Sequence, residues 1–157
     1  MSLKYDFNLG GLFINNNNCT TEKLECLIRG SWELSILRFH VLQQEFESQY
    51  KDRCNDINGR LGVNTIIIDL LELGDAYRKA SLIMDIIRDS EQPIWIWFIN
   101  CEALKNTSLA GWLRSVLTTY YVEHIRVAFV LDNKELYKDI FQNHSTPLYE
   151  FTTSLEV

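Results

Sequence analysis

The sequence predicts an α/β fold: a single domain in which a mostly parallel or mixed sheet is covered by helices. The chain has 157 residues, 46% of them hydrophobic and 23% charged, which suits one globular domain with its own core. From residue 61 to 157, short β-branched and aromatic runs alternate with segments of helical periodicity. Strands and helices that alternate at this spacing imply right-handed crossovers and a sheet covered by helices.

Residues 1–60 are less regular. Alternating apolar residues around a Gly pair predict a short strand from Tyr5 to Ile14, and the polar tract Asn15–Asn18 predicts a loop. The segment Leu24–Ile28 fits either the second strand of a hairpin or a helical turn opened by Thr21. Gly30 is expected to end this element in both cases.

A long helix is predicted from Ser31 onward, and it should be the longest element of the chain. Its end is expected near Asn58, because Gly59 can supply the left-handed cap conformation. Within this helical pattern His40 is expected to be a solvated or locally bonded side chain. The apolar residues that recur at helical spacing, with one seven-residue step, are Ile36, Phe39, Leu42, Phe46, Tyr50 and Ile57.

Four strands and three helices are predicted after this helix. The first strand is continuous and β-branched, as in strands covered on both faces. In the second strand, period 2 places Trp95 and Trp97 on one face, where we expect them to fill the core. The predicted strands are 65–70, 94–99, 126–131 and 148–151, and the predicted helices are 75–90, 108–121 and 134–142.

Charge and cysteine spacing exclude several classes of function. The 15 Lys and Arg are scattered and outnumbered by 21 Asp and Glu, so no basic face for nucleic acid is expected. The net charge of −6 favours solubility or a basic protein partner. The four cysteines are isolated, with no C-x-x-C pair, so neither a zinc site nor a redox dithiol is expected. We expect no metal and no cofactor.

The chain is expected to be cytoplasmic. Its longest apolar run, 94–99, is far shorter than a membrane span of about 20 residues, and its start lacks a secretory apolar region. The nucleophile elbow, the dinucleotide-binding glycines and the P-loop are all absent from the sequence. A non-enzymatic role is therefore favoured.

Polar residues follow three successive predicted strands. Asp69, Asn100 and Asp132 stand at strand ends, and they should converge if the strands are neighbours. Such oxygen ligands could hold Mg²⁺ in a phosphate- or nucleotide-handling enzyme. The same residue types also start turns and cap helices at strand ends in any sheet of this kind.

A second candidate site lies at the start of the predicted helix 108–121. There Thr107 or Ser108 can cap the helix, and the helix dipole favours an anion.

From residue 94 to the end, the order of elements and this short segment resemble the STAS domain of anti-sigma factor antagonists. The family carries an Asp-Ser-Ser-Gly loop motif at the start of a helix. Here Asn106 stands for the Asp and Leu109 for the Gly. The matching elements are the strand 94–99, the loop Asn106-Thr107-Ser108-Leu109, the strand 126–131, the helix 134–142 and the strand 148–151.

The resemblance implies a phosphorylation-switched regulatory domain. In the family, a partner kinase that is also the anti-sigma factor phosphorylates the second Ser of the motif, which falls on Ser108. We therefore expect a non-enzymatic domain that binds a protein partner through Asn106, Thr107 and Ser108. The alternatives are an immunity-type inhibitor of a basic toxin and the Mg²⁺-dependent enzyme above. A homo-oligomer would use the exposed edge of a first or last strand, or the long helix from Ile36 to Ile57, as its contact surface.

Overall fold

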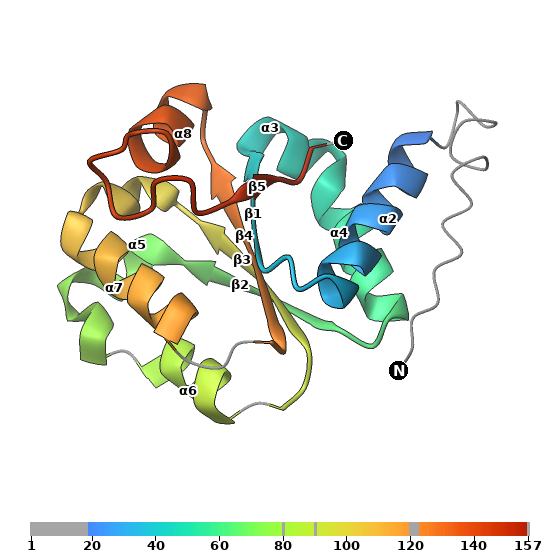
Figure 1. Ribbon diagram of the computed structural model, residues 1–157, viewed down its shortest axis with the longest axis horizontal. Helices are drawn as coiled ribbons and strands as arrows, with labels where there is room; N and C mark the ends of the chain where they lie inside the picture. The colour runs from blue at the N-terminus through green and yellow to red at the C-terminus, as the bar shows by residue number, and fades with distance from the viewer. Residues whose placement is uncertain (1–18, 80, 90, 120–122, 157) are drawn as a thin grey trace.

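The sheet contains five strands that all run parallel. The structure, a computed structural model, describes residues 19–79, 81–89, 91–119 and 123–156 (Figure 1). The sheet order is β2-β3-β4-β1-β5, with every pairing parallel. The α/β prediction is therefore confirmed. The strands are β1 (Arg38–Leu42), β2 (Asn64–Asp69), β3 (Ile94–Ile99), β4 (Ile125–Leu131) and β5 (Thr153–Ser154).

Helices cover both faces of the sheet (Figure 1). One face carries α2 (Cys19–Glu33), α3 (Gln43–Glu45), a π-helical turn (Phe46–Tyr50) and α4 (Lys51–Arg60). The other face carries α5 (Leu70–Leu73), α6 (Ser81–Asp89), α7 (Thr107–Thr119) and α8 (Lys134–Phe141), with 3-10 turns at Gly74–Lys79 and Cys101–Lys105.

Two apolar cores follow from the period-2 alternation of the strands. Trp95 and Trp97 lie in the core beneath α2 and α4, and both are 0% exposed. Ile96 and Phe98, on the opposite face of the same strand, lie in the core beneath the other helices. The prediction that the two tryptophans fill the core is confirmed.

The long helix predicted from Ser31 is wrong, because β1 interrupts it. In Arg38–Leu42 the buried positions alternate, with Phe39 and Val41 facing the core, and the strand pairs with both β4 and β5. A segment inside the sheet satisfies its backbone groups on both sides, which overrides a helical spacing. The helical part resumes at Gln43 and ends at Arg60. The left-handed glycine beyond it is Gly62, with φ +77°, and not Gly59.

The N-terminal expectations are resolved in part. Leu24–Ile28 is helical, which is one of the two predicted alternatives, but Gly30 does not end the helix. It is buried inside α2, which continues to Glu33. The strand predicted at Tyr5–Ile14 and the loop at Asn15–Asn18 lie outside the described residues.

The last predicted strand, 148–151, is wrong. This segment forms turns, in which Tyr149 N–H donates to the Thr146 carbonyl and Phe151 N–H to the Leu148 carbonyl. Leu148 and Phe151 are both buried in the core beneath α7 and α8, and their spacing of three suits a turn better than a strand. The short β5 follows at Thr153–Ser154.

The apolar run of β2 predicts a strand covered on both faces, and this prediction is wrong. It stands at the edge of the sheet, and Ile67 is 47% exposed. The chain crosses from β1 to the far side of the sheet before it enters β2, so the covering helices reach this strand only in part.

Candidate functional site

The helix α7 begins with a capped and exposed turn. Asn106 Oδ1 accepts hydrogen bonds from the backbone N–H groups of Ser108, at 3.0 Å, and Leu109, at 3.3 Å. The Asn106 carbonyl accepts the N–H of Ala110 at 3.0 Å. The cap is therefore Asn106, and the prediction that Thr107 or Ser108 caps the helix is wrong. An Asn side-chain oxygen at the N-cap position reaches the second and third N–H groups of a helix.

This cap leaves both hydroxyl side chains facing solvent. Thr107 and Ser108 are exposed, whereas Leu109 and Ala110 are buried in the core. Asn106 Oδ1 binds the backbone N–H of Ser108, and the Ser108 hydroxyl itself makes no hydrogen bond within the described part of the chain. Asn106, Thr107 and Ser108 thus lie together at the exposed start of a 13-residue helix.

The loop before α7 is tied to α8. Lys105 Nζ lies 3.9 Å from Asp139 Oδ2, and both side chains are more than half exposed. An ion pair that is so exposed contributes at most about 1 kcal/mol. Lys105, one residue before the cap, therefore carries its charge beside the carboxylate of Asp139.

The three strand-end residues Asp69, Asn100 and Asp132 all lie at the carboxyl ends of the strands, and β2, β3 and β4 are neighbours in the sheet. Asp69 and Asp132 are nevertheless separated by a whole strand, which spaces their backbones about 9.6 Å apart. Asp69 Oδ1 accepts the N–H of Leu71 at 2.9 Å and so caps α5. Asn100 adopts a left-handed conformation with φ 55°, which Asn tolerates better than most residues.

The described residues contain no group of three or more His, Cys, Asp or Glu placed to hold a metal ion. Next to Asp132, Asn133 caps α8 by accepting the N–H of Leu136 at 2.9 Å. Asp69 and Asn133 thus cap helices, which is the common role of Asp and Asn at the ends of strands.

A groove lies at the carboxyl ends of β1 and β4, where the two connections leave the sheet on opposite faces. Strands β1 and β4 are adjacent, but the chain leaves β4 for the face of α8 and leaves β1 for the face of α4. Ligands in open α/β sheets bind at the carboxyl ends of such strand pairs. A cavity of about 260 Å³ lies there, lined by residues that include Leu42 at the end of β1 and Lys134 at the start of α8.

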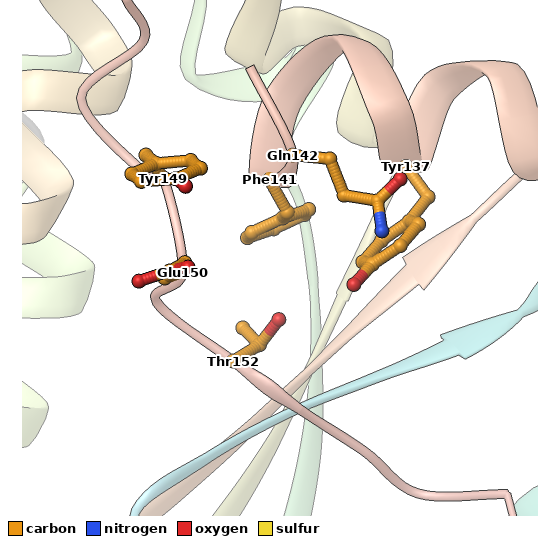
Figure 2. Close-up of a pocket in the computed structure, with 6 residues that line it drawn as sticks. All are labelled: Tyr137, Phe141, Gln142, Tyr149, Glu150 and Thr152. Atoms are coloured by element: carbon orange, nitrogen blue, oxygen red, sulfur yellow. The ribbon is translucent and has the colours of Figure 1, made fainter. Parts of the chain in front are cut away.

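A second cavity of about 430 Å³ shares Tyr137 and Gln142 with the first. Figure 2 shows its lining: Tyr137 and Phe141 come from α8, Gln142 directly follows this helix, and Tyr149, Glu150 and Thr152 come from the C-terminal segment. Glu150 has a positive φ of 53°, a conformation that a residue with a side chain adopts only under constraint. Its N–H donates to the Phe141 carbonyl at 2.9 Å, which holds the segment against α8.

His40 lies at the base of the groove. Its Nδ1 lies 2.8 Å from Thr152 Oγ1, and its ring stacks on Tyr137 with the centroids 4.4 Å apart. The expectation of a solvated or locally bonded histidine in a helix is wrong, because His40 sits on β1 and its partner Thr152 lies 112 positions away in the sequence. Sequence reasoning missed the groove because it placed His40 in a helix and the segment 148–151 in a strand.

The protein should lose stability in mild acid because of His40. Burial lowers the pKa of its imidazole from 6.5 to about 4. Between these values the unfolded chain binds a proton that the folded protein does not, so the free energy of unfolding falls as the pH falls from 6.5 toward 4. We expect His40 to account for a loss of about 2 kcal/mol between about pH 7 and pH 4.5.

Urea denaturation at a series of pH values measures this effect. His40→Gln cannot titrate, so its free energy of unfolding should change less over the same range than that of the wild type. His144→Gln is the matched control, because His144 is exposed, and it should keep the wild-type dependence. Parallel curves for the wild type and His40→Gln would contradict the prediction.

No helix among the described residues has the length and the apolar character needed to cross a membrane. Comparison of the chain with protein-family models, with curated proteins and with solved structures gives no match.

Proposed function

We propose that this protein is a non-enzymatic regulatory domain that binds a protein partner through the start of α7 and is switched by phosphorylation of Ser108. The observation that carries the proposal is the exposed Ser108 hydroxyl at the capped start of a 13-residue helix. The same position corresponds to the phosphorylated serine of the STAS domains that the C-terminal part of the sequence resembles. The partner would then be the kinase itself.

Phosphorylation of Ser108 would change the charge of this surface sharply. A phosphate adds about −1.5 to −2 charges near neutral pH. The N-terminus of the helix favours an anion at this place, so the modified helix would stay folded. A partner surface that fits the uncharged Thr107 and Ser108 would meet a charged, hydrated group instead. Docking would weaken without a change in the fold.

The charge-mimicking variant Ser108→Asp should reduce capture of the partner by about tenfold or more, equivalent to about 1.4 kcal/mol. Ser108→Ala should reduce it less, because it adds no charge. The measurement is affinity capture by tagged wild-type and variant proteins from the cytoplasm of the source cells, with quantitative mass spectrometry of the retained proteins.

Ser115→Asp is the matched control. Ser115 is also exposed on α7 but lies two turns from the helix start, so the variant adds the same charge elsewhere on the same helix. Thermal denaturation should show Ser108→Asp to be as stable as the wild type or about 0.3–1 kcal/mol more stable, because an acidic residue at a helix N-terminus is favourable. Equal capture by the wild type, Ser108→Asp and Ser108→Ala would rule out the switch.

A further inference from the structure

The outer edge of β2 carries unpaired backbone groups. β2 is a terminal strand of the sheet and pairs only with β3 among the described strands. The Asn64 N–H donates to the Pro93 carbonyl on the β3 side at 3.1 Å. Successive residues of a strand direct their N–H and C=O groups to opposite sides. Thr65 and Ile67 therefore direct theirs away from the sheet.

This edge lacks most of the features that usually prevent strands from pairing, and its one charged residue, Asp69, stands at the end of the strand. Proteins protect an edge with Lys, Pro, bulges or a very short strand. β2 has six residues, and its sequence Asn-Thr-Ile-Ile-Ile-Asp contains neither Lys nor Pro. The opposite edge of the sheet is protected by its length, because β5 has only two residues. Of the two edges, β2 is the one built to accept another strand.

The edge is also apolar on its exposed side. Ile67 is 47% exposed, and Leu71, two residues beyond the strand, is 51% exposed. Only two other large hydrophobic side chains, Leu34 and Tyr149, are comparably exposed in the described part of the chain. Ile67 is thus an exposed apolar side chain on the terminal strand itself, and Leu71 follows it on α5.

We propose that a second copy of this chain pairs with this edge, β2 against β2 in antiparallel orientation, around a two-fold axis at Ile67. The two central residues would then face each other as a hydrogen-bonded pair and exchange two N–H···O bonds. Their side chains would lie on the same face of the joined sheet, with Cβ atoms about 4.5–5.5 Å apart, and would cover each other. The two five-stranded sheets would become one continuous sheet.

The register that this axis fixes is self-complementary. Ile66 lies opposite Ile68 of the second copy, and Thr65 lies opposite Asp69 of the second copy, so a hydroxyl and not a like charge faces the carboxylate. The two Asp69 side chains are four residues apart along the joined strands, about 13 Å. This distance exceeds the screening length of about 8 Å at physiological salt. A two-fold axis makes the same patch serve on both copies, as in most soluble dimers.

The mass of the full chain in solution tests the proposal. Size-exclusion chromatography with light scattering, run up to about 100 μM, should give a mass that rises to that of a dimer, in the range of a modest interface. Ile67→Lys places a charge at the axis and should give a monomer throughout. Leu34→Lys, at a side chain that is 70% exposed and lies on another surface, should leave the dimer intact. Equal thermal stability of the two variants would exclude misfolding as the cause.

Cysteine cross-linking tests the register. The Cα atoms of a hydrogen-bonded antiparallel pair lie about 5.5 Å apart, so two thiols at the axis lie within reach of a short bifunctional maleimide. Ile67→Cys should therefore form a covalent dimer when it is treated with this reagent. Asn64→Cys is on the same exposed strand, but its symmetry mate lies about 20 Å away along the joined strands, so it should not.

A wild-type monomer at every concentration, a dimer that survives Ile67→Lys, or equal cross-linking of the two cysteine variants would each overturn the proposal. If the wild type is a monomer, the edge of β2 would instead be available to a strand of another protein. The dimer does not depend on the Ser108 switch, and the phosphate-mimicking variant Ser108→Asp should keep it.

Discussion

Replacing Trp97 with alanine is expected to lower the free energy of unfolding by about 3–5 kcal/mol, a large part of the stability of a domain of this size. Trp97 is 0% exposed. Its ring packs edge-on against Phe46, with centroids 4.9 Å apart, and against Trp95 at 5.6 Å. Its Nε1–H donates to Asn55 Oδ1 at 2.9 Å. The variant would lose these contacts and leave a cavity between β3 and α4.

Urea denaturation followed by circular dichroism measures this loss. Trp97→Phe should be milder than alanine, because it keeps a ring in the core and loses mainly the indole N–H bond to Asn55. Leu34→Ala, at a side chain that is 70% exposed, should stay within about 0.5 kcal/mol of the wild type. A loss below about 1 kcal/mol for Trp97→Ala would mean that the side chain does not fill the core.

Arg126→Met should lower the free energy of unfolding by about 3 kcal/mol. Arg126 is 1% exposed, and its guanidinium lies 4.2 Å from the centroid of the Trp32 ring. Its Nε donates to the Ser31 carbonyl at 2.9 Å, in the last turn of α2. Its Nη1 donates to the carbonyls of Glu123 and Ile125, each at 2.9 Å. The side chain thus joins the end of α2 to β4.

Burial lowers the pKa of Arg126 to about 10, so the guanidinium is still charged at neutral pH. A cation beside the C-terminal carbonyls of a helix interacts favourably with the helix dipole. Methionine keeps an unbranched apolar stem but donates no hydrogen bond, so the carbonyls of Glu123 and Ile125 lose the donor that Arg126 supplies, whereas the Ser31 carbonyl keeps the Ile36 N–H at 3.1 Å.

Arg126→Lys is the matched variant for this test. It keeps the charge but cannot reproduce the planar fork of donors, so its unfolding midpoint in urea should fall between those of the wild type and Arg126→Met. Equal stability of all three proteins would show that the guanidinium contributes nothing to the junction between α2 and β4.

The elements that the sequence predicts best are those whose pattern is local and continuous. β3 coincides with its predicted range, because six apolar residues follow Pro93 without interruption. The helix predicted from Lys134 differs from α8 by one residue at its end. β1 escapes prediction because five residues of alternating burial lie between two helical segments, and only its pairing with β4 and β5 identifies it as a strand.

The candidate site is predictable to a similar degree. α7 starts at Thr107, one residue before the start predicted from local sequence, and the choice of Asn106 as the cap depends on where its side chain turns. The convergence of Asp69, Asn100 and Asp132 at one edge depends on strand order, which periodicity alone does not fix. The groove beside His40 requires contacts between residues more than a hundred positions apart, such as the one with Thr152.

The peptide Asn106–Arg114 offers the most direct test of the Ser108 switch. Trypsin releases it, because Lys105 precedes it and Arg114 ends it, and Thr107 and Ser108 are its only hydroxyl side chains. The protein is purified from its own cells as two pools, free and partner-bound, and the peptide from each is analysed by mass spectrometry. The account predicts phosphate on Ser108 in the free pool and unmodified Ser108 in the bound pool. A peptide without phosphate in both pools, or with equal phosphate in both, would contradict it.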